Sequence, residues 1–224
     1  MEVHRPKHLG NWREFGKEVG VIVLGVCIAL AGEQTVEWLH WRQEVADARH
    51  ALDQEAAYDL GAIRMRQREA PCIDRRLSEI RSLLTRPAGA STPRPPLGQP
   101  QLWRPRTNVW QVTMAGQVAE HMPLDMRLAY AELYDGFQWY SQKAADETDA
   151  WSILGELDDP GDLQPEQAAS LRQARSRAQV AADKLNANMP RIARAGARLG
   201  IRPAAVEETP LTAEQIKALC RPSS

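Results

Sequence analysis

The stretch VGVIVLGVCIALAG, residues 19–32, is an uncharged apolar run of 14 residues. As an α-helix it is about 21 Å long, which is shorter than the hydrocarbon core of a bilayer at about 30 Å. Tryptophans flank the run, and the 26 residues from Trp12 to Trp38 would span about 39 Å as a helix. That separation is typical of the aromatic belts at the two faces of a membrane. We therefore predict a transmembrane helix over residues 19–39, with Trp12, Trp38 and Trp41 in its belt.

The charges around the run favour a cytoplasmic N-terminus. Basic side chains are more frequent before the run than in the 20 residues after it: Arg5, Lys7, Arg13 and Lys17 precede it, and Arg42 and Arg49 follow it. Because basic flanks are retained in the cytoplasm, we expect residues 1–18 there and residues 40–224 on the other side of the membrane. Two alternatives stay open. One is a cleaved signal peptide, since residues 29–31 (ALA) resemble a cleavage site, and the other is the buried helix of a soluble protein.

The sequence EFGKEVGVIVLGVCIALAGEQTVEWLHWRQEVADARHAL, residues 14–52, resembles the start of a group of uncharacterised bacterial proteins. Those proteins have a single N-terminal membrane helix followed by a helical body. The resemblance implies a membrane anchor in a Gram-negative-type cell, and with the charge bias it implies an inner-membrane protein whose body is periplasmic. It implies no activity, cofactor or catalytic residue.

The composition of the chain favours an all-α fold. Hydrophobic residues at 43% and charged residues at 25% are typical of a globular chain, and there are only two phenylalanines and few alternating apolar and polar runs. No proline interrupts residues 32–69, so we expect the anchor to continue straight into a long helix that Pro71 ends. A second, short amphipathic helix is predicted after it. These two stalk helices occupy residues 40–85.

Residues 86–106 contain six prolines and predict a surface linker with polyproline character. Residues 107–224 predict an antiparallel helical hairpin that forms a small bundle, followed by a short C-terminal helix. Apolar residues recur alternately four and three apart in both arms of the hairpin, in a seam of Met126, Tyr130, Leu133, Phe137, Tyr140, Ala144, Glu147, Trp151 and Leu154 and a second seam of Ala168, Leu171, Arg175, Ala178, Ala182, Leu185, Met189, Ile192, Gly196 and Leu199.

Each seam contains one charged member, and these two are expected to meet. A turn centred near Gly161 places Glu147 against Arg175, which predicts a structural salt bridge that sets the register. Charge supports the pairing, because residues 124–159 hold nine acidic and two basic side chains and residues 163–202 hold eight basic and two acidic ones.

The chain has three cysteines. Cys27 lies in the apolar run and is expected to stay a thiol, which leaves Cys72 and Cys220 as the one pair in the body. In an oxidising periplasm a pair within reach forms a disulfide, so we predict this bridge. If the body is cytoplasmic, the two are instead expected to be free and buried.

No feature of the sequence points to an enzyme. The net charge is -1, and phosphate-binding glycine-rich loops, zinc-protease motifs and nucleophile elbows are absent from the sequence. We expect no cofactor, metal or nucleic acid, although the basic residues after 163 leave a nucleic-acid or phospholipid surface as a lesser alternative. The resulting hypothesis is a non-enzymatic, membrane-anchored helical protein that contacts the bilayer and another protein or copies of itself. A ligand-sensing helical bundle is the alternative.

Overall fold

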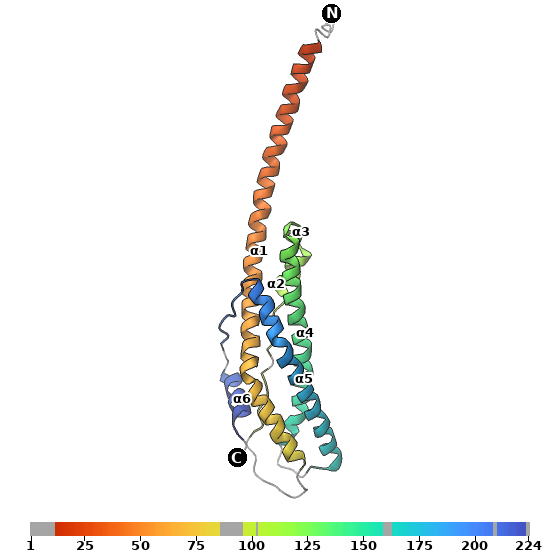
Figure 1. Cartoon of the computed structure of the whole chain (residues 1–224), viewed down its shortest axis with the longest axis vertical. Helices are drawn as coiled ribbons and strands as arrows, with labels where there is room; N and C mark the ends of the chain where they lie inside the picture. Colours follow the sequence, from red (N-terminus) through yellow and green to blue (C-terminus); the bar gives the residue numbers. More distant parts are fainter. Residues whose placement is uncertain (1–11, 86–95, 102, 159–162, 208–209, 223–224) are drawn as a thin grey trace, which may run out of the picture. The chain divides into compact units, whose positions relative to one another are not determined.

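The computed structural model describes residues 12–85, 96–101, 103–158, 163–207 and 210–222 (Figure 1). All regular secondary structure in this part of the chain is helical, which confirms the all-α prediction. The elements are α1 (Trp12–Leu84), α2 (Asn108–Ala115), α3 (Val118–His121), α4 (Leu124–Leu154), the 3-10 helix η1 (Gly155–Asp158), α5 (Pro165–Arg198) and α6 (Pro210–Cys220).

The chain forms two compact units, residues 1–48 and residues 49–224. The described part of the first unit is the beginning of α1, and none of its described side chains is buried. The second unit contains the rest of α1 and all the other helices. We call these the N-terminal unit and the C-terminal unit.

Helix α1 does not end at Pro71, so the prediction of two separate stalk helices is wrong. The helix continues to Leu84 with the proline inside it. A proline in a helix interior costs about 3 kcal/mol, because it removes one hydrogen bond and its ring crowds the preceding turn. Burial of Ile73, Leu77 and Ile80 on the core side of the following turns offsets that loss. In Figure 1 the last part of α1, drawn in yellow, is inclined to the part before it.

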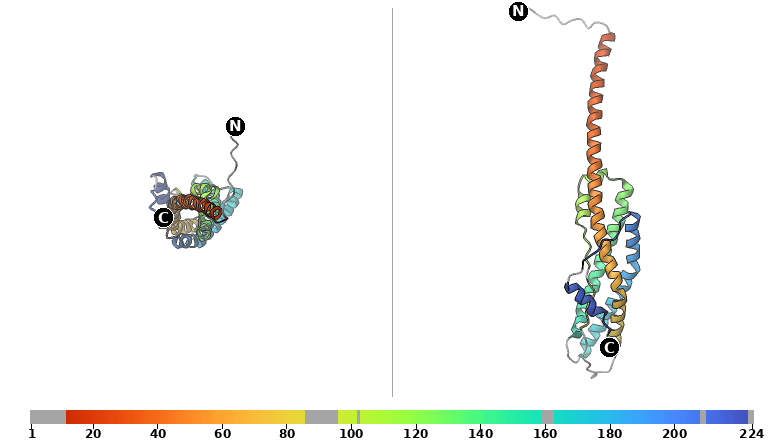
Figure 2. Two further views of the ribbon diagram at one scale, coloured as in Figure 1. Left: turned by 90° about the horizontal axis from the view of Figure 1, so that it is seen from above. Right: turned by 90° about the vertical axis from the view of Figure 1, so that its left-hand side faces the viewer.

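Three long helical segments surround the core of the C-terminal unit: residues 49–84 of α1, α4 and α5. Contacts far apart in sequence give their directions. Asp53 meets Tyr130 and Arg66 meets Glu147, so α1 and α4 run the same way. Arg175 bonds to the Leu77 carbonyl while Gly196 lies against Leu60, so α5 runs opposite to α1. Figure 2 shows the three segments side by side along the unit.

The apolar series along α4 and α5 face this core. In α4 every predicted seam position except the half-buried Met126 is buried, including Glu147. In α5 the positions from Leu171 to Gly196 are buried apart from Arg175, which is half-buried. Around the lower turns these helices share one cluster with α1, η1 and α6, made up of Ile73, Leu77, Ile80, Leu97, Ala150, Trp151, Leu154, Leu157, Leu171, Ala174, Ala178, Ala182 and Leu219.

The parallel order of α1 and α4 requires a long connection that returns along the bundle. Residues 96–107 supply its described part, apart from residue 102, and we call them the strap. They contain no helix, and the side chains of Leu97 and Trp103 are buried. The predicted linker over residues 86–106 therefore includes a packed segment of the C-terminal unit.

Candidate functional site

The most unusual surface of the chain is the apolar part of α1 in the N-terminal unit. Its large apolar side chains between Val19 and Leu30 are 40% to 70% exposed. A continuous apolar surface of this kind is unfavourable in water and marks a segment that lipid or another protein covers. By length and composition this is the one helix in the described residues that is apolar enough to cross a membrane, and a signal sequence would pass the same test.

The three predicted belt tryptophans differ in their surroundings. Trp12 and Trp38 are exposed, at 85% and 57%, and the Arg42 guanidinium stacks 5.2 Å from the centre of the Trp38 ring. Trp41 is half-buried, and its indole N–H donates to Glu37 across 3.4 Å. None of the apolar window is buried in the structure, so the alternative of a core helix within this chain finds no support.

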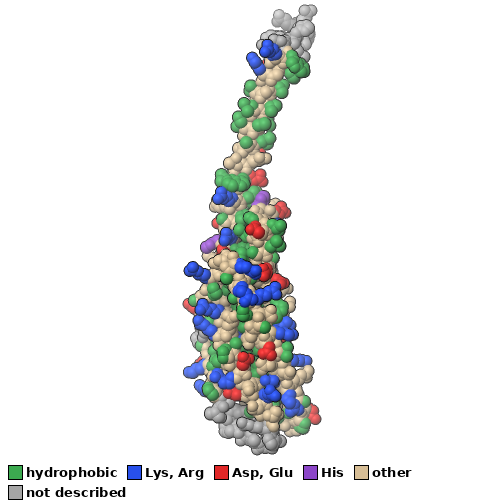
Figure 3. All heavy atoms as spheres, in the orientation of Figure 1, with side chains coloured by type: hydrophobic (Ala, Val, Ile, Leu, Met, Phe, Trp, Pro, Cys, Tyr) green, Lys and Arg blue, Asp and Glu red, His purple; other side chains and the backbone are tan. Residues whose placement is uncertain are grey.

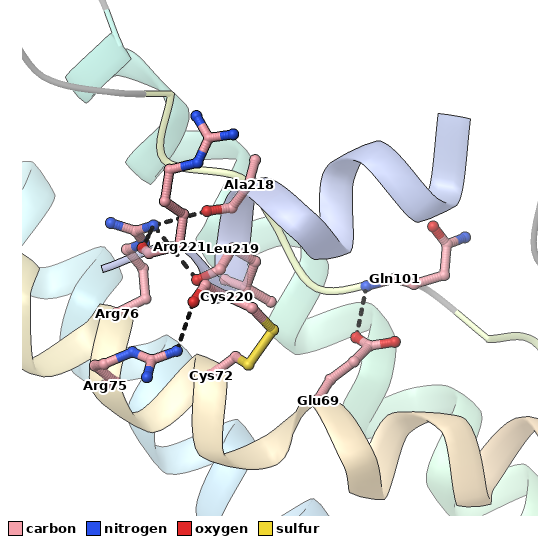
Figure 4. Close-up of a disulfide and its surroundings, with 9 residues drawn as sticks. All are labelled: Glu69, Cys72, Arg75, Arg76, Gln101, Ala218, Leu219, Cys220 and Arg221. Atoms are coloured by element: carbon pink, nitrogen blue, oxygen red, sulfur yellow. Dashed lines mark hydrogen bonds between the residues drawn. A yellow bond between two sulfur atoms is a disulfide. The ribbon is translucent and has the colours of Figure 1, made fainter. Parts of the chain in front are cut away.

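The predicted disulfide between Cys72 and Cys220 is present, with the two Cα atoms 4.8 Å apart (Figure 4). It joins α1 to the last residue of α6. Two arginines of α1 reinforce the joint, because they donate to carbonyl groups at the C-terminal end of α6. Arg75 Nη2 lies 2.8 Å from the Cys220 oxygen, and Arg76 Nη2 lies 2.8 Å from the Ala218 oxygen. A cation at a helix C-terminus satisfies these carbonyls and interacts favourably with the helix dipole.

Gly98 of the strap passes directly over this joint. Its φ is +66°, a conformation that L side chains rarely adopt. A Cβ at this position would collide with the backbone of Leu219, which is fully buried in the core. Glycine is therefore required here both for the backbone angle and for the close approach of the strap to α6.

The charged centre of the bundle is a pair that the sequence analysis did not predict. Glu147 pairs with Arg66 of α1, with Nη2 2.7 Å from Oε1 and Nε 3.2 Å from Oε2, and both side chains are buried. The predicted salt bridge between Glu147 and Arg175 is therefore wrong. Arg175 instead donates to the Leu77 carbonyl and to Gln179.

The error has a structural reason: the seam on α4 faces α1 as well as α5. A signal was available, because Arg66 comes three residues after Ile63 and seven before Ile73, in phase with the apolar stripe of α1. A charged residue at a core position of one helix needs a charged partner from a neighbouring helix. The position of Arg66 in that stripe therefore made it a candidate partner for Glu147.

A column of buried carboxylates on α1 holds the strap and the start of α2. Glu55 accepts the backbone N–H groups of Val109 and Trp110 at 3.0 and 3.3 Å, which caps the N-terminus of α2. Asp59 accepts the N–H of Arg106 at 2.9 Å, and Glu69 accepts the N–H of Gln101 at 3.1 Å. Glu69 also accepts the indole N–H of Trp103 at 3.2 Å.

The spacing of these contacts fits a segment that runs antiparallel to α1. Ten helical residues from Asp59 to Glu69 rise about 15 Å. A span of five positions, from Gln101 to Arg106, can cover this distance, because an extended chain advances about 3.3 Å per residue. The distance between the two carboxylates on α1 therefore matches the distance between the two N–H groups of the strap. Each N–H group can then lie opposite a buried acceptor.

Burial raises the pKa values of these carboxyl groups. The pKa of Asp59 is raised from 3.8 to about 7, first by burial and also by the nearby charge of Glu55, against the opposing bond from the Arg106 N–H. Burial likewise raises the pKa of Glu69 and of Glu147, and the Arg66 charge opposes both shifts. The second oxygen of Asp59 is buried without a hydrogen-bond partner. With its pKa at about 7, the Asp59 carboxyl group gains or loses its proton near neutral pH.

Beside the ion pair lies a small cavity of about 10 Å³, which is space for one water molecule. Glu147, Tyr140 and Trp151 line it together with strap residues 99–101. The Tyr140 hydroxyl and the Trp151 indole N–H are buried without a partner, and a water here would satisfy polar groups of this kind. The cavity is too small for a metabolite.

The basic side chains of α5 form an open surface. Arg191, Arg194 and Arg198 line a solvent-open groove with Glu132, and Arg198 pairs with Glu132 at 2.6 Å. Among the described residues this is the one ion pair between α4 and α5, so the complementary charges of the two helices act mostly without direct contact. The groove has no aromatic side chain to stack a base.

The described residues bring together no group of three His, Cys, Asp or Glu side chains suited to holding a metal ion. The buried acids of α1 accept hydrogen bonds from backbone and indole groups, and these interactions give each of them a structural role. Comparison of the chain with protein-family models, curated proteins and solved structures finds no match.

Proposed function

We propose that this chain is a non-enzymatic, membrane-anchored protein whose C-terminal unit lies in the bacterial periplasm and contacts other proteins or further copies of the chain. One combination of features carries the proposal: an apolar helix surface that nothing in the structure covers, in the same chain as a disulfide-bonded helical unit.

Membrane insertion is supported by the exposure of the apolar run and by the character of its ends. Residues 19–32 carry no charge, and exposed tryptophans lie before and after them. Burial of such side chains in lipid is favourable by about 1.5 to 3 kcal/mol for each large residue. Retention of this segment as an anchor is consistent with its place inside α1, which continues without a break from Trp12 to Leu84.

A periplasmic C-terminal unit is supported by the disulfide and by the charge bias. Disulfides persist in oxidising compartments and are rare in the cytosol. The basic residues that precede the run favour a cytoplasmic N-terminus, which places Cys72 and Cys220 on the oxidising side.

An interaction role is supported by the way the C-terminal unit is built. The cavity beside Glu147 has space for one water, and the buried charges of the unit fix the strap, α2 and α6. Because these hydrogen bonds hold the strap, α2 and α6 in place, the unit presents a fixed surface to a partner. Ligand sensing, the alternative function, is less favoured by the geometry, because the cavity beside Glu147 has space for one water and the groove at Arg191, Arg194 and Arg198 is open to solvent.

Fractionation and topology experiments test the anchor. The full chain should stay with membranes through carbonate extraction, and its recovery in the soluble fraction would contradict the proposal. A phosphatase fused at the C-terminus should be active, whereas one fused at Gly10 should be inactive. A cleaved signal peptide would be revealed by a mature chain that begins after residue 31.

A pull-down tests the interaction role. The full chain is solubilised in mild detergent, captured and analysed for stoichiometric partners. One co-purifying protein, or a defined oligomer of the chain, supports the proposal. A monomer that carries a bound metabolite and no protein would support ligand sensing instead.

A further inference from the structure

We propose that the C-terminal unit makes a second contact with the lipid bilayer, through the exposed side chains of Val112, Leu124 and Leu128. We call these three residues the end patch. This inference rests on the proposed function, because it requires the apolar run of α1 to be inserted in the membrane.

Large apolar side chains are seldom exposed in the C-terminal unit. Among its described residues there are four, and three of them form the end patch: Val112 is 73% exposed, Leu124 62% and Leu128 60%. The fourth, Val180, is 49% exposed on the middle of α5. Leu124 and Leu128 are one helical turn apart and share a face of α4. Their exposure in one region marks a surface that another phase or molecule covers.

Hydrogen bonds locate the end patch at the end of the unit where its first residues lie. The Tyr130 hydroxyl donates to Asp53, which places the start of α4 beside the first turns of this unit. Glu55 caps α2, which places Val112 in the same region. The beginning of α5 lies at the opposite end (Figure 1). Figure 3 shows hydrophobic side chains on the surface around the start of α4.

The length of the chain favours lipid as the occupant. Arg49, the first residue of the C-terminal unit, comes only ten positions after Leu39, the last residue of the predicted membrane segment. Ten residues span about 15 Å as a helix and at most about 35 Å when fully extended. An inserted anchor therefore keeps this end of the unit within reach of the lipid headgroups at a high effective concentration, whereas a second copy must be recruited by diffusion.

The exposed charged side chains nearest to the end patch in the sequence are acidic, whereas Arg127 is half-buried, so we expect an apolar rather than an electrostatic contact. Glu120 and Asp125 are exposed close to it in the sequence and would be repelled by anionic headgroups. Contact should therefore persist in vesicles of zwitterionic phosphatidylcholine. Addition of phosphatidylglycerol should not strengthen it.

Depth-dependent fluorescence quenching tests the proposal on the full, non-reduced chain in phosphatidylcholine vesicles. A small fluorophore is attached at one thiol in each of three proteins: native Cys27, Leu128→Cys in a Cys27→Ser background, and Val180→Cys in the same background. Lipids with a nitroxide at a shallow or a deep acyl position act as quenchers. Val180 is the matched control, because it too is an exposed apolar residue.

We expect the label at position 128 to be quenched several-fold more than the label at position 180, and more by the shallow than by the deep nitroxide. The label on Cys27 should be quenched more by the deep nitroxide. Equal, weak quenching at 128 and 180 with strong quenching at Cys27 would overturn the second contact and leave the anchor intact. Absence of quenching at Cys27 would overturn the anchor and this inference together. Self-quenching between labels at 128 without lipid quenching would show that a second copy covers the patch, and would also overturn it.

Discussion

The substitution Asp59→Asn should make the protein more stable at neutral and alkaline pH. Asp59 is fully buried, its pKa is raised to about 7 from 3.8, and one of its oxygens has no partner. The folded state therefore retains a proton on Asp59 between about pH 4 and pH 7 while the unfolded state has already released it. Since stability changes with pH according to the protons bound in the unfolded state minus those in the folded state, it falls as pH rises through this window.

The size of the effect follows from the shift in pKa. A difference of about three pKa units corresponds to about 4 kcal/mol, which is the most that ionisation of Asp59 removes by pH 8. Asparagine keeps an oxygen that accepts the Arg106 N–H and cannot ionise. The variant should therefore match the wild type near pH 4 and exceed it at pH 8 by at most about 4 kcal/mol.

The assay is urea unfolding of the full chain in detergent micelles at a series of pH values, followed by tryptophan fluorescence with the disulfide intact. Asp47→Asn is the control, because Asp47 is an exposed carboxylate on the same helix and no raised pKa is attributed to its charge. It should leave the pH profile unchanged. Part of the wild-type slope should survive in Asp59→Asn, because burial also raises the pKa values of Glu69 and Glu147. Identical slopes for Asp59→Asn and the wild type between pH 4 and pH 8 would refute the reasoning.

Three further predictions follow from the contacts of the C-terminal unit. Arg66→Ala should destabilise the C-terminal unit by about 3 to 5 kcal/mol, because Glu147 is left buried and unpaired. A double-mutant cycle of Arg66→Ala with Glu147→Ala should show a strong coupling energy, whereas a cycle of Glu147→Ala with Arg175→Ala should show no coupling. Cys72→Ser should lower stability by up to about 5 kcal/mol, since it opens a loop of 148 residues, and the non-reduced wild type should migrate faster in gel electrophoresis than the variant. Gly98→Ala should destabilise the unit by at least about 1 kcal/mol in thermal unfolding, because of the positive φ of Gly98 and its contact with Leu219. Gly155→Ala, with open space around the new Cβ, should have little effect, and equal losses of stability for the two glycine variants would contradict the role of Gly98.

Local patterns were sufficient to predict several features of this molecule. The apolar run and its flanking tryptophans identified the candidate membrane segment, and the four-three spacing identified which faces of α4 and α5 are buried. Such patterns succeed because the helical period depends on the backbone alone, so a stripe of apolar residues reports burial without knowledge of the partner. Cysteine content with the expected topology predicted the disulfide, because only two cysteines lie outside the apolar run.

The partners across the core depended on the packing of all three long helices. Periodicity says that the α4 position of Glu147 is buried, but the choice between Arg66 and Arg175 depends on which helix lies opposite it. The proline at 71 has the local preference to end a helix, and packing of the following turns against α4 and α5 overrides that preference. The strap is proline-rich and reads as a solvent-exposed linker. The strap and the start of α2 are bound because residues 32 to 55 positions away supply buried carboxylates for the N–H groups of Gln101, Arg106, Val109 and Trp110, and no local pattern encodes contacts over that distance.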